Sequence, residues 1–151
     1  THLPVEIILK ESISFYHKDF GQKPDIFLFL SAHVPFRTAK NIEDAISTLL
    51  SSGFDSVISA EKIREPVFAH SDNGLELLNA GRLNNLDKQN EQLYSFNSSI
   101  VCGWVDNLEN NKVFGDRINF IEFPQHSLSK INNEKDWDNL SSQIEQGLIE
   151  W

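Results

Sequence analysis

The sequence predicts a single α/β domain, residues 1–151, with a mostly parallel sheet, helices on both faces and an antiparallel excursion. Three observations lead to this fold class. Stretches with helical spacing of apolar residues alternate with short apolar runs that suit strands, which is the repeating unit of an open parallel sheet. A hairpin signal interrupts that order near the middle of the chain. The 151 residues and 40% hydrophobic content suit one globular domain.

The N-terminal part of the chain predicts a helix followed by a buried strand. Apolar residues recur at helical spacing over residues 4–16, and residues 21–24 break that pattern. The five consecutive apolar residues Ile26–Leu30 are typical of a strand buried on both faces, as in a parallel sheet. Residues 31–37 then form a loop that contains Pro35.

A second helix and strand follow, with local start and stop signals. Thr38 is placed to cap the helix, and Gly53 ends it. Residues 55–60 predict the next strand. The apolar stripe of the helix consists of Ile42, Ala45, Ile46, Leu49 and Leu50.

The middle of the chain, residues 66–104, predicts the antiparallel excursion. Two short β-rich stretches flank a Ser-Asp-Asn-Gly turn at residues 71–74, which indicates a hairpin. Residues 82–92 are polar and rich in Asn and Gln, so we expect them at the surface. Tyr94–Trp104 is a further strand candidate.

The C-terminal part predicts short strands and a final helix. Residues 113–114 and 118–123 are β-rich, and Asn133 is placed to cap the helix. The predicted buried face of that helix consists of Trp137, Leu140, Ile144 and Leu148.

Composition excludes some classes of partner and location. The net charge of −9 at pH 7 argues against a nucleic-acid partner, because phosphate binding needs a positive face. No apolar run approaches the roughly 18 residues that span a bilayer, so no membrane partner is expected. The first twenty residues show no signal-peptide pattern, and Cys102 is the only cysteine, so we expect a cytoplasmic location.

The loop at residues 31–37 is the strongest candidate site, because open α/β sheets bind ligands at the carboxyl ends of their strands. Arg37 could bind a phosphate or carboxylate with its planar fork, and the helix start at Thr38 adds amide donors. The alternative is a surface arginine that pairs with a nearby carboxylate. His33 could act as acid, base or ligand, although a hydrogen-bonded loop histidine is the simpler interpretation. The five histidines show no metal-ligand spacing.

The segment FLFLSAHVPFRTAKNIEDAISTLLSSGFDSVISAEKI, residues 27–63, resembles the CMP-sugar synthetases, cytidylyltransferases that include the acylneuraminate cytidylyltransferases. That family places a loop of the form L-Q-P-T-S-P-L-R between a buried strand and a helix, followed by a strand reading D-S-V-x-S. Pro35 and Arg37 match the loop, and residues 55–59 match the strand. Residues 88–97 resemble the family's R-Q…Y…N-G-A stretch, and residues 131–137 its I-D-I-D-x-x-x-D-W ending. The resemblance implies a Rossmann-like nucleotidyltransferase sheet.

The resemblance implies a substrate-binding role for Ser31, His33, Arg37, Lys88, Gln89 and Asn97. Several residues depart from the family pattern. Ser31 stands where the family has a sugar-contacting glutamine, and Lys88 where an arginine meets the sugar carboxylate. Lys130 and Asn132 stand where two aspartates bind the metal. Residues 1–23 contain no counterpart of the basic phosphate loop, A-R-x-G-S-K, so the domain is N-terminally incomplete relative to the family.

By resemblance, CTP and a nonulosonic, sialic-acid-like sugar would give a CMP-sugar and pyrophosphate, with Mg²⁺ as the family's metal. Because of the departures, we expect this chain alone to be inactive and not to bind Mg²⁺, and we assign no catalytic residue. Two alternatives stay open: a non-catalytic relative that binds a nucleotide or sugar or assembles with an active partner, and a family member that acts on a different sugar acid. The resemblance also implies a homodimer through residues 65–97.

Overall fold

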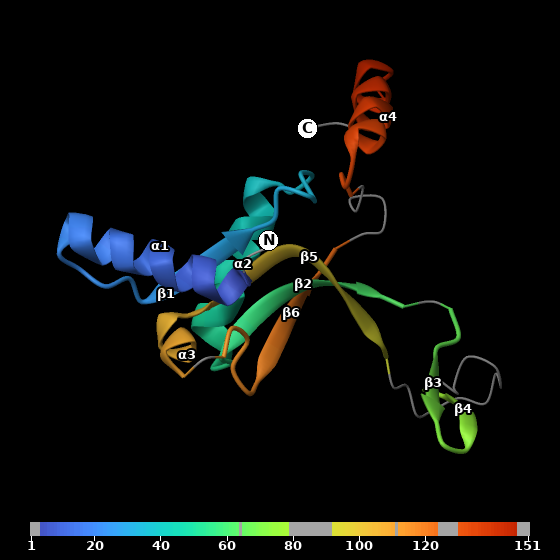
Figure 1. Cartoon of the computed structure of the whole chain (residues 1–151), viewed down its shortest axis with the longest axis horizontal. Coiled ribbons are helices and arrows are strands. Elements are labelled where there is room, and N and C mark those ends of the chain that lie inside the picture. The colour runs from blue at the N-terminus through green and yellow to red at the C-terminus, as the bar shows by residue number, and fades with distance from the viewer. Residues whose placement is uncertain (1–3, 64, 79–91, 111, 124–129, 148–151) are drawn as a thin grey trace.

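The computed structural model describes residues 4–63, 65–78, 92–110, 112–123 and 130–147 of the chain. The predicted order of helices and strands is confirmed with two differences: one short helix, α3, is added, and the β-rich residues 113–114 form no strand. Figure 1 shows the elements in chain order: α1 (Val5–Phe20), β1 (Ile26–Leu30), α2 (Ala39–Ser52), β2 (Ser56–Lys62), β3 (Phe68–Ser71), β4 (Gly74–Leu77), β5 (Tyr94–Trp104), α3 (Val105–Glu109), β6 (Ile118–Glu122) and α4 (Glu134–Glu145).

Local capping sets the ends of the longer helices. α1 runs past its predicted end to Phe20, where Gly21 adopts a left-handed φ of 69° and its N–H donates to the His17 carbonyl. α2 lies between the predicted Thr38 cap and Gly53, which also has a left-handed backbone. Thr38 and Asn41 exchange side-chain to backbone hydrogen bonds, so the start of α2 is a full capping box.

Four of the described strands form one sheet in the order β1-β5-β2-β6. β5 pairs antiparallel with β1 and with β2, whereas β2 and β6 pair in parallel. The sheet is therefore mixed, and the expectation of a mostly parallel sheet is not confirmed. The reason is the excursion: the chain leaves the carboxyl end of β2 and returns at that same end as β5. β5 must then run against both of its neighbours.

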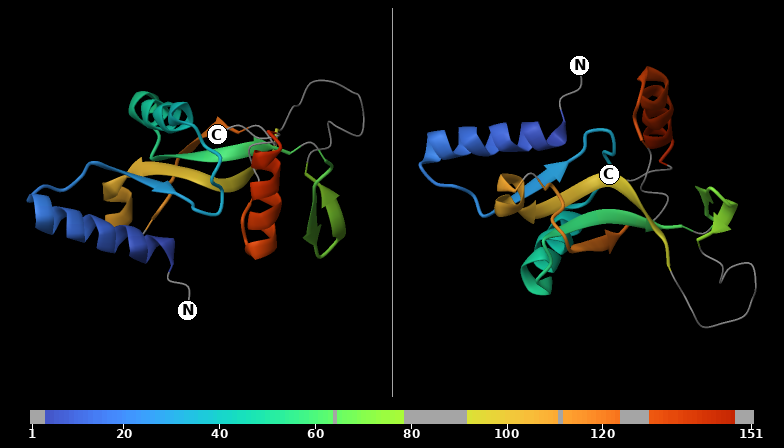
Figure 2. Two further views of the ribbon diagram at one scale, coloured as in Figure 1. Left: turned by 90° about the horizontal axis from the view of Figure 1, so that it is seen from above. Right: turned by 60° about the horizontal axis from the view of Figure 1, so that its bottom comes forward.

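Helices cover both faces of this sheet, as the sequence predicts (Figure 2). One face packs against α2, with a core of Ala45, Leu49, Val57, Ile100, Cys102 and Phe123. The other face packs against α1 and α3, with a core of Leu9, Phe27, Val101, Val105 and Leu108. Successive β5 residues alternate between the two cores, which is the period-two pattern of a strand buried on both faces.

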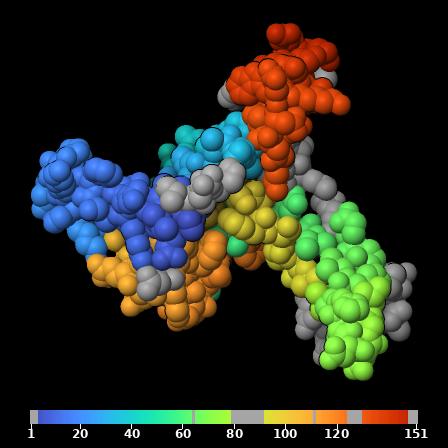
Figure 3. Space-filling model, viewed as in Figure 1, coloured from blue at the N-terminus to red at the C-terminus, as the bar shows by residue number. Residues whose placement is uncertain are grey.

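The β3–β4 hairpin and α4 stand away from the sheet (Figure 3). The hairpin forms its own two-stranded sheet, with Ser71 paired to Gly74 at the turn that the sequence predicts. In α4, Leu140 is buried, but Trp137 is 57% exposed. The predicted buried face of α4 is therefore wrong at Trp137, and Leu148 lies outside the described residues.

Candidate functional site

The candidate site lies at the end of the sheet where three strands reach their carboxyl ends, which we call the carboxyl edge. β1 and β2 both run antiparallel to β5, and β6 runs parallel to β2. All three strands therefore point in the same direction, and their carboxyl ends meet at this edge. β5 enters the sheet at the same edge, and its residues 97–100 lie beside the ends of β1 and β2. In open α/β sheets this is the edge that binds ligands.

The loop at residues 31–37 folds back on itself around Arg37. Arg37 Nη1 donates hydrogen bonds to the carbonyl oxygens of Ser31 (2.7 Å) and Val34 (2.6 Å). Val34 is buried, and the Ser31 hydroxyl accepts a hydrogen bond from the His33 N–H (3.2 Å). The partial burial of Arg37 lowers the pKa of its guanidinium. One guanidinium nitrogen of Arg37, Nη1, therefore stabilises the loop conformation, a role that sequence reasoning missed.

Arg37 has no ion pair with a carboxylate among the described residues. The alternative interpretation of Arg37 as one half of a surface ion pair therefore finds no support in the described part of the chain. A guanidinium that is half-buried and has no counter-ion is electrostatically suited to an anionic group. The predicted ligand-binding role of Arg37 stays a prediction.

A bulge in β5 forms the second part of the edge. Opposite Ser59 the β2–β5 register shifts, and Ser98 adopts a left-handed φ of 66°. Asn97 is 2% exposed, and its Oδ1 accepts hydrogen bonds from the Ser59 hydroxyl and from the Ser99 N–H. Asn97 Nδ2 and Ser99 Oγ are buried without a hydrogen-bond partner among the described residues. The Ser31 N–H donates to the Ser99 carbonyl (3.2 Å), which joins this bulge to the loop.

The segment before α4 completes the edge. The Ile131 N–H donates to the His33 carbonyl, and His33 Nδ1 lies 2.8 Å from the Ile131 carbonyl oxygen, so two hydrogen bonds join this segment to the loop. His33 is thus a hydrogen-bonded loop histidine, the simpler of its two interpretations. Asn133 caps α4 as predicted, and Asp136 Oδ2 accepts the Asn132 N–H (2.9 Å). No group of three His, Cys, Asp or Glu side chains in the described ranges could hold a metal ion.

The structure brings together four of the six predicted site residues. Ser31, His33 and Arg37 share the loop, and Asn97 is joined to them through Ser99. Lys88 and Gln89 lie outside the described residues. Sequence reasoning missed Ser59 and Ser99 as partners of Asn97; three consecutive small polar residues within an apolar strand were the available signal for a bulge there.

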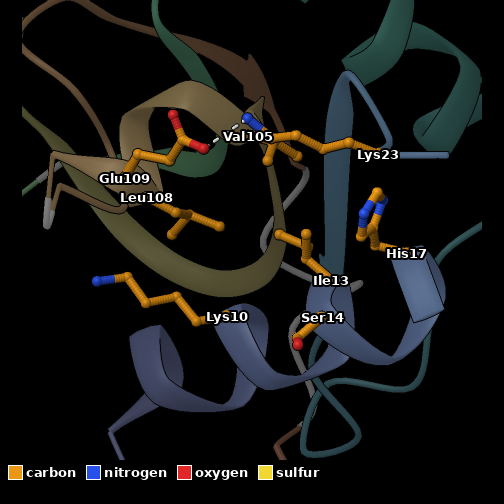
Figure 4. A pocket seen from close by; sticks show the side chains of 8 residues that line it. All are labelled: Lys10, Ile13, Ser14, His17, Lys23, Val105, Leu108 and Glu109. Atoms are coloured by element: carbon orange, nitrogen blue, oxygen red, sulfur yellow. Dashed lines mark hydrogen bonds and ion pairs between the residues drawn. The ribbon is translucent and has the colours of Figure 1, made fainter. Parts of the chain in front are cut away.

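Two hollows lie at the opposite, amino-terminal end of β1. A cavity of about 340 Å³ separates α1 from α3, with Ile13, Leu108 and Lys23 among its lining residues (Figure 4). Lys23 Nζ lies 2.7 Å from Glu109 and 3.1 Å from Asp106, and these hydrogen bonds raise its pKa. A second hollow of about 470 Å³ lies at the start of β1. Because Lys23, which lines both, already has carboxylate partners, the carboxyl edge is the better candidate for binding an anion.

Asp55, which belongs to the matched D-S-V-x-S motif, has a structural role at the amino-terminal edge. Its Oδ2 accepts the N–H groups of Asp116 (2.9 Å) and Arg117 (2.8 Å). These backbone hydrogen bonds, first that from Arg117, hold the pKa of the Asp55 carboxyl below its ordinary value. Asp55 therefore fastens the turn before β6 and lies far along the strand from the candidate site.

The mixed sheet, with helices on both faces and a candidate site at the carboxyl edge, defines an α/β protein compatible with a nucleotidyltransferase fold. No protein-family model matches the sequence, and no curated protein matches it either. Among solved structures, the chain is similar to 4-diphosphocytidyl-2C-methyl-D-erythritol synthase from Anaerococcus prevotii, with a TM-score of 0.63 and 12% sequence identity. The match covers 95% of this chain and 68% of that chain. At this identity, the likeness shows the fold alone.

Proposed function

We propose that this chain is a member of the cytidylyltransferase family that binds a cytidine nucleotide, CTP, at the carboxyl edge of its sheet. Two independent lines support the family: the sequence resemblance of residues 27–63, and the fold shared with a solved synthase whose name includes a diphosphocytidyl group. In the described residues no helix is long and apolar enough to cross a membrane.

The observation that carries the proposal is the gathering of cationic and unpaired polar groups at one edge of an acidic chain. Arg37 has no carboxylate partner among the described residues, and the paired hydrogen bonds between His33 and Ile131 bring the segment that starts at Lys130 to the same edge. The chain as a whole carries a net charge of −9. Arg37 and Lys130 thus supply two cationic groups at this end of the sheet, which suits a phosphate or a carboxylate.

We extend this proposal to the second substrate and to the reaction. By resemblance, the second substrate is a nonulosonic sugar acid and the product a CMP-sugar. The described residues at this edge do not fit a Mg²⁺ site, because Lys130 supplies an ammonium and Asp136 already accepts the Asn132 N–H. We therefore expect no release of pyrophosphate from CTP by this chain alone.

The test is a thermal-shift titration of the full chain with CTP, cytidine and a panel of nonulosonic acids. A ligand at a hundred times its Kd stabilises the folded state by about 2.7 kcal/mol. For a chain of this size we expect that to raise the Tm by roughly 5–10 °C. Pyrophosphate release, measured in the same samples with and without Mg²⁺, tests the expected lack of turnover.

Matched variants locate the site. Arg37→Lys keeps the charge and loses the fork, so it should weaken CTP about tenfold or more while leaving cytidine binding unchanged. Arg117→Lys makes the same change at the opposite, amino-terminal end of the sheet and should leave the binding of both CTP and cytidine unchanged. Equal losses of CTP and cytidine in Arg37→Lys would assign Arg37 a purely structural role, and an absence of any shift with CTP would overturn the proposal.

A second candidate function, assembly into a homodimer through residues 65–97, is favoured by the β3–β4 hairpin. Phe68 and Leu75 are 50% and 70% exposed, and an isolated two-stranded hairpin is marginally stable in water. A second copy would cover these side chains. Light scattering should therefore report a dimer that Leu75→Glu converts to a monomer, whereas Glu76→Gln on the same strand should have no effect. A wild-type monomer at high micromolar concentration would rule this assembly out.

A further inference from the structure

The cavity between α1 and α3 has an apolar interior. Ile13 of α1 and Val105 and Leu108 of α3 line it, and Figure 4 shows Ile13 opposite Leu108. Val105 and Leu108 belong to the core on this face of the sheet, and Ile13 packs against that core. The cavity therefore adjoins well-packed side chains on both of its helices.

The size of the cavity suits a small molecule. Its volume is about 340 Å³. An apolar cavity of about 150 Å³ takes up one benzene ring, and ligand pockets in proteins begin at about 300 Å³. The cavity between α1 and α3 therefore has room for an apolar body of two fused rings.

The ammonium groups around the cavity already have carboxylate partners. Lys10 Nζ lies 3.0 Å from Glu6 Oε1, and Lys23 Nζ pairs with both Asp106 and Glu109. An anionic ligand would compete with these ion pairs and would meet the carboxylate of Glu109, which also lines the cavity. Because an uncharged ligand displaces none of the pairs, the electrostatics of the cavity favour an uncharged ligand.

Two polar side chains of α1 at the cavity have unused hydrogen-bonding capacity. Ser14 and His17 lie one helical turn apart and both line the cavity, and neither side chain has a hydrogen-bond partner among the described residues. The hydroxyl of Ser12, by contrast, donates to the Ile8 carbonyl (2.8 Å). Since a hydroxyl and an imidazole can each donate or accept, Ser14 and His17 can orient one hydroxyl or carbonyl group of a ligand.

We propose that the cavity between α1 and α3 binds an uncharged molecule with an apolar body of about two fused rings and one hydroxyl or carbonyl group, which Ser14 and His17 orient. The apolar body lies between Ile13 and Leu108. Because the cavity is at the amino-terminal end of β1, this site is separate from the carboxyl edge and does not depend on binding of CTP. The ligand adds apolar contacts between α1 and α3, so it stabilises the docking of α1 on the sheet.

The test titrates the full 151-residue chain with 2-naphthol, naphthalene and 2-naphthoate at neutral pH and follows binding and amide hydrogen exchange by NMR. We expect 2-naphthol to bind with a Kd on the order of 0.1 mM. At saturation it should slow amide exchange in α1 by about tenfold, with little change in α2. 2-Naphthoate carries a carboxylate on the same rings and should bind about tenfold more weakly or worse. Equal or tighter binding of 2-naphthoate would overturn the assignment of an uncharged ligand.

Matched variants of α1 locate the ligand. Ser14→Trp places an indole in the cavity and should weaken 2-naphthol about tenfold or more, whereas Ser12→Trp, two residues away and not lining the cavity, should leave its Kd unchanged. His17→Phe keeps an aromatic ring without its nitrogens, so it should weaken 2-naphthol roughly two- to tenfold, the effect of one lost hydrogen bond, and leave naphthalene unchanged. Equal Kd values in the two tryptophan variants would place the ligand elsewhere and overturn the proposal. Equal losses of 2-naphthol and naphthalene in His17→Phe would overturn the orienting role of His17.

Discussion

The substitution Gly115→Ala tests how the turn before β6 is fastened. Gly115 has a left-handed φ of 72°, and an added Cβ would lie 2.3 Å from the Asp55 Cβ. Asp55 cannot move aside freely, because its carboxylate accepts two backbone N–H groups from the same turn. Gly53→Ala is the matched control, since Gly53 has a φ of 66° but nothing within 4 Å of its added Cβ.

The two variants share one free-energy cost and differ in another. A non-glycine residue in the left-handed region costs about 1–2 kcal/mol, which is the expected loss for Gly53→Ala. Gly115→Ala adds the cost of overpacking, about 1–3 kcal/mol, so its free energy of unfolding should fall by about 2–5 kcal/mol in total. Urea unfolding followed by circular dichroism measures both values. Equal losses in the two variants would refute the proposed contact with Asp55.

The pH dependence of stability gives a second readout of the same contact. The pKa of Asp55 is lowered in the folded state from its ordinary value of 3.8. The stability that Asp55 contributes is therefore present above that value and is lost as the pH falls below it. In Gly115→Ala the displaced carboxylate should regain an ordinary pKa, so the variant should lose less stability than the wild type on acidification below 3.8.

Two further predictions concern the core on the α2 side of the sheet. Leu49→Ala should destabilise the fold by about 2–5 kcal/mol, because Leu49 is fully buried, whereas Leu50→Ala at a 61% exposed position should change stability by less than about 1 kcal/mol in the same urea assay. Burial raises the pKa of the Cys102 thiol from 9.0 to about 11. At pH 8 a thiol reagent such as DTNB should therefore label Cys102 only after unfolding. The free energy of unfolding should decline as the pH rises from 9 towards 11, because the folded state keeps the thiol proton that the unfolded state loses. Rapid labelling of the native protein at pH 8 would contradict that burial.

Local chemistry made much of the fold predictable from the sequence. Thr38 and Asn133 were predicted as helix caps and are confirmed, because a cap depends on hydrogen bonds within one turn of the chain. The turn at residues 71–74 is confirmed for the same reason. The apolar run Ile26–Leu30 correctly predicts a strand with side chains packed on both faces.

Contacts between distant segments had no local signal and were decided only by the tertiary structure. The insertion of β5 between β1 and β2 depends on pairings across tens of residues, so periodicity predicts a strand there but not its neighbours or its direction. Trp137 shares a helical stripe with Leu140, yet the stripe does not say which of its members another element covers. α3 was missed because it continues an apolar strand without a turn signal.

The candidate site shows the same division. The sequence by itself determined that residues 31–37 follow a buried strand and precede a capped helix, because both signals are local. Only the tertiary structure decided that Arg37 bonds to carbonyls of its own loop and that His33 meets Ile131, 98 residues later. It also decided that Asn97 Nδ2, beside Ser99, is buried without a hydrogen-bond partner among the described residues. The physical reason is that hydrogen-bond partners and burial are properties of packed neighbours, and the fold brings those neighbours from distant parts of the chain.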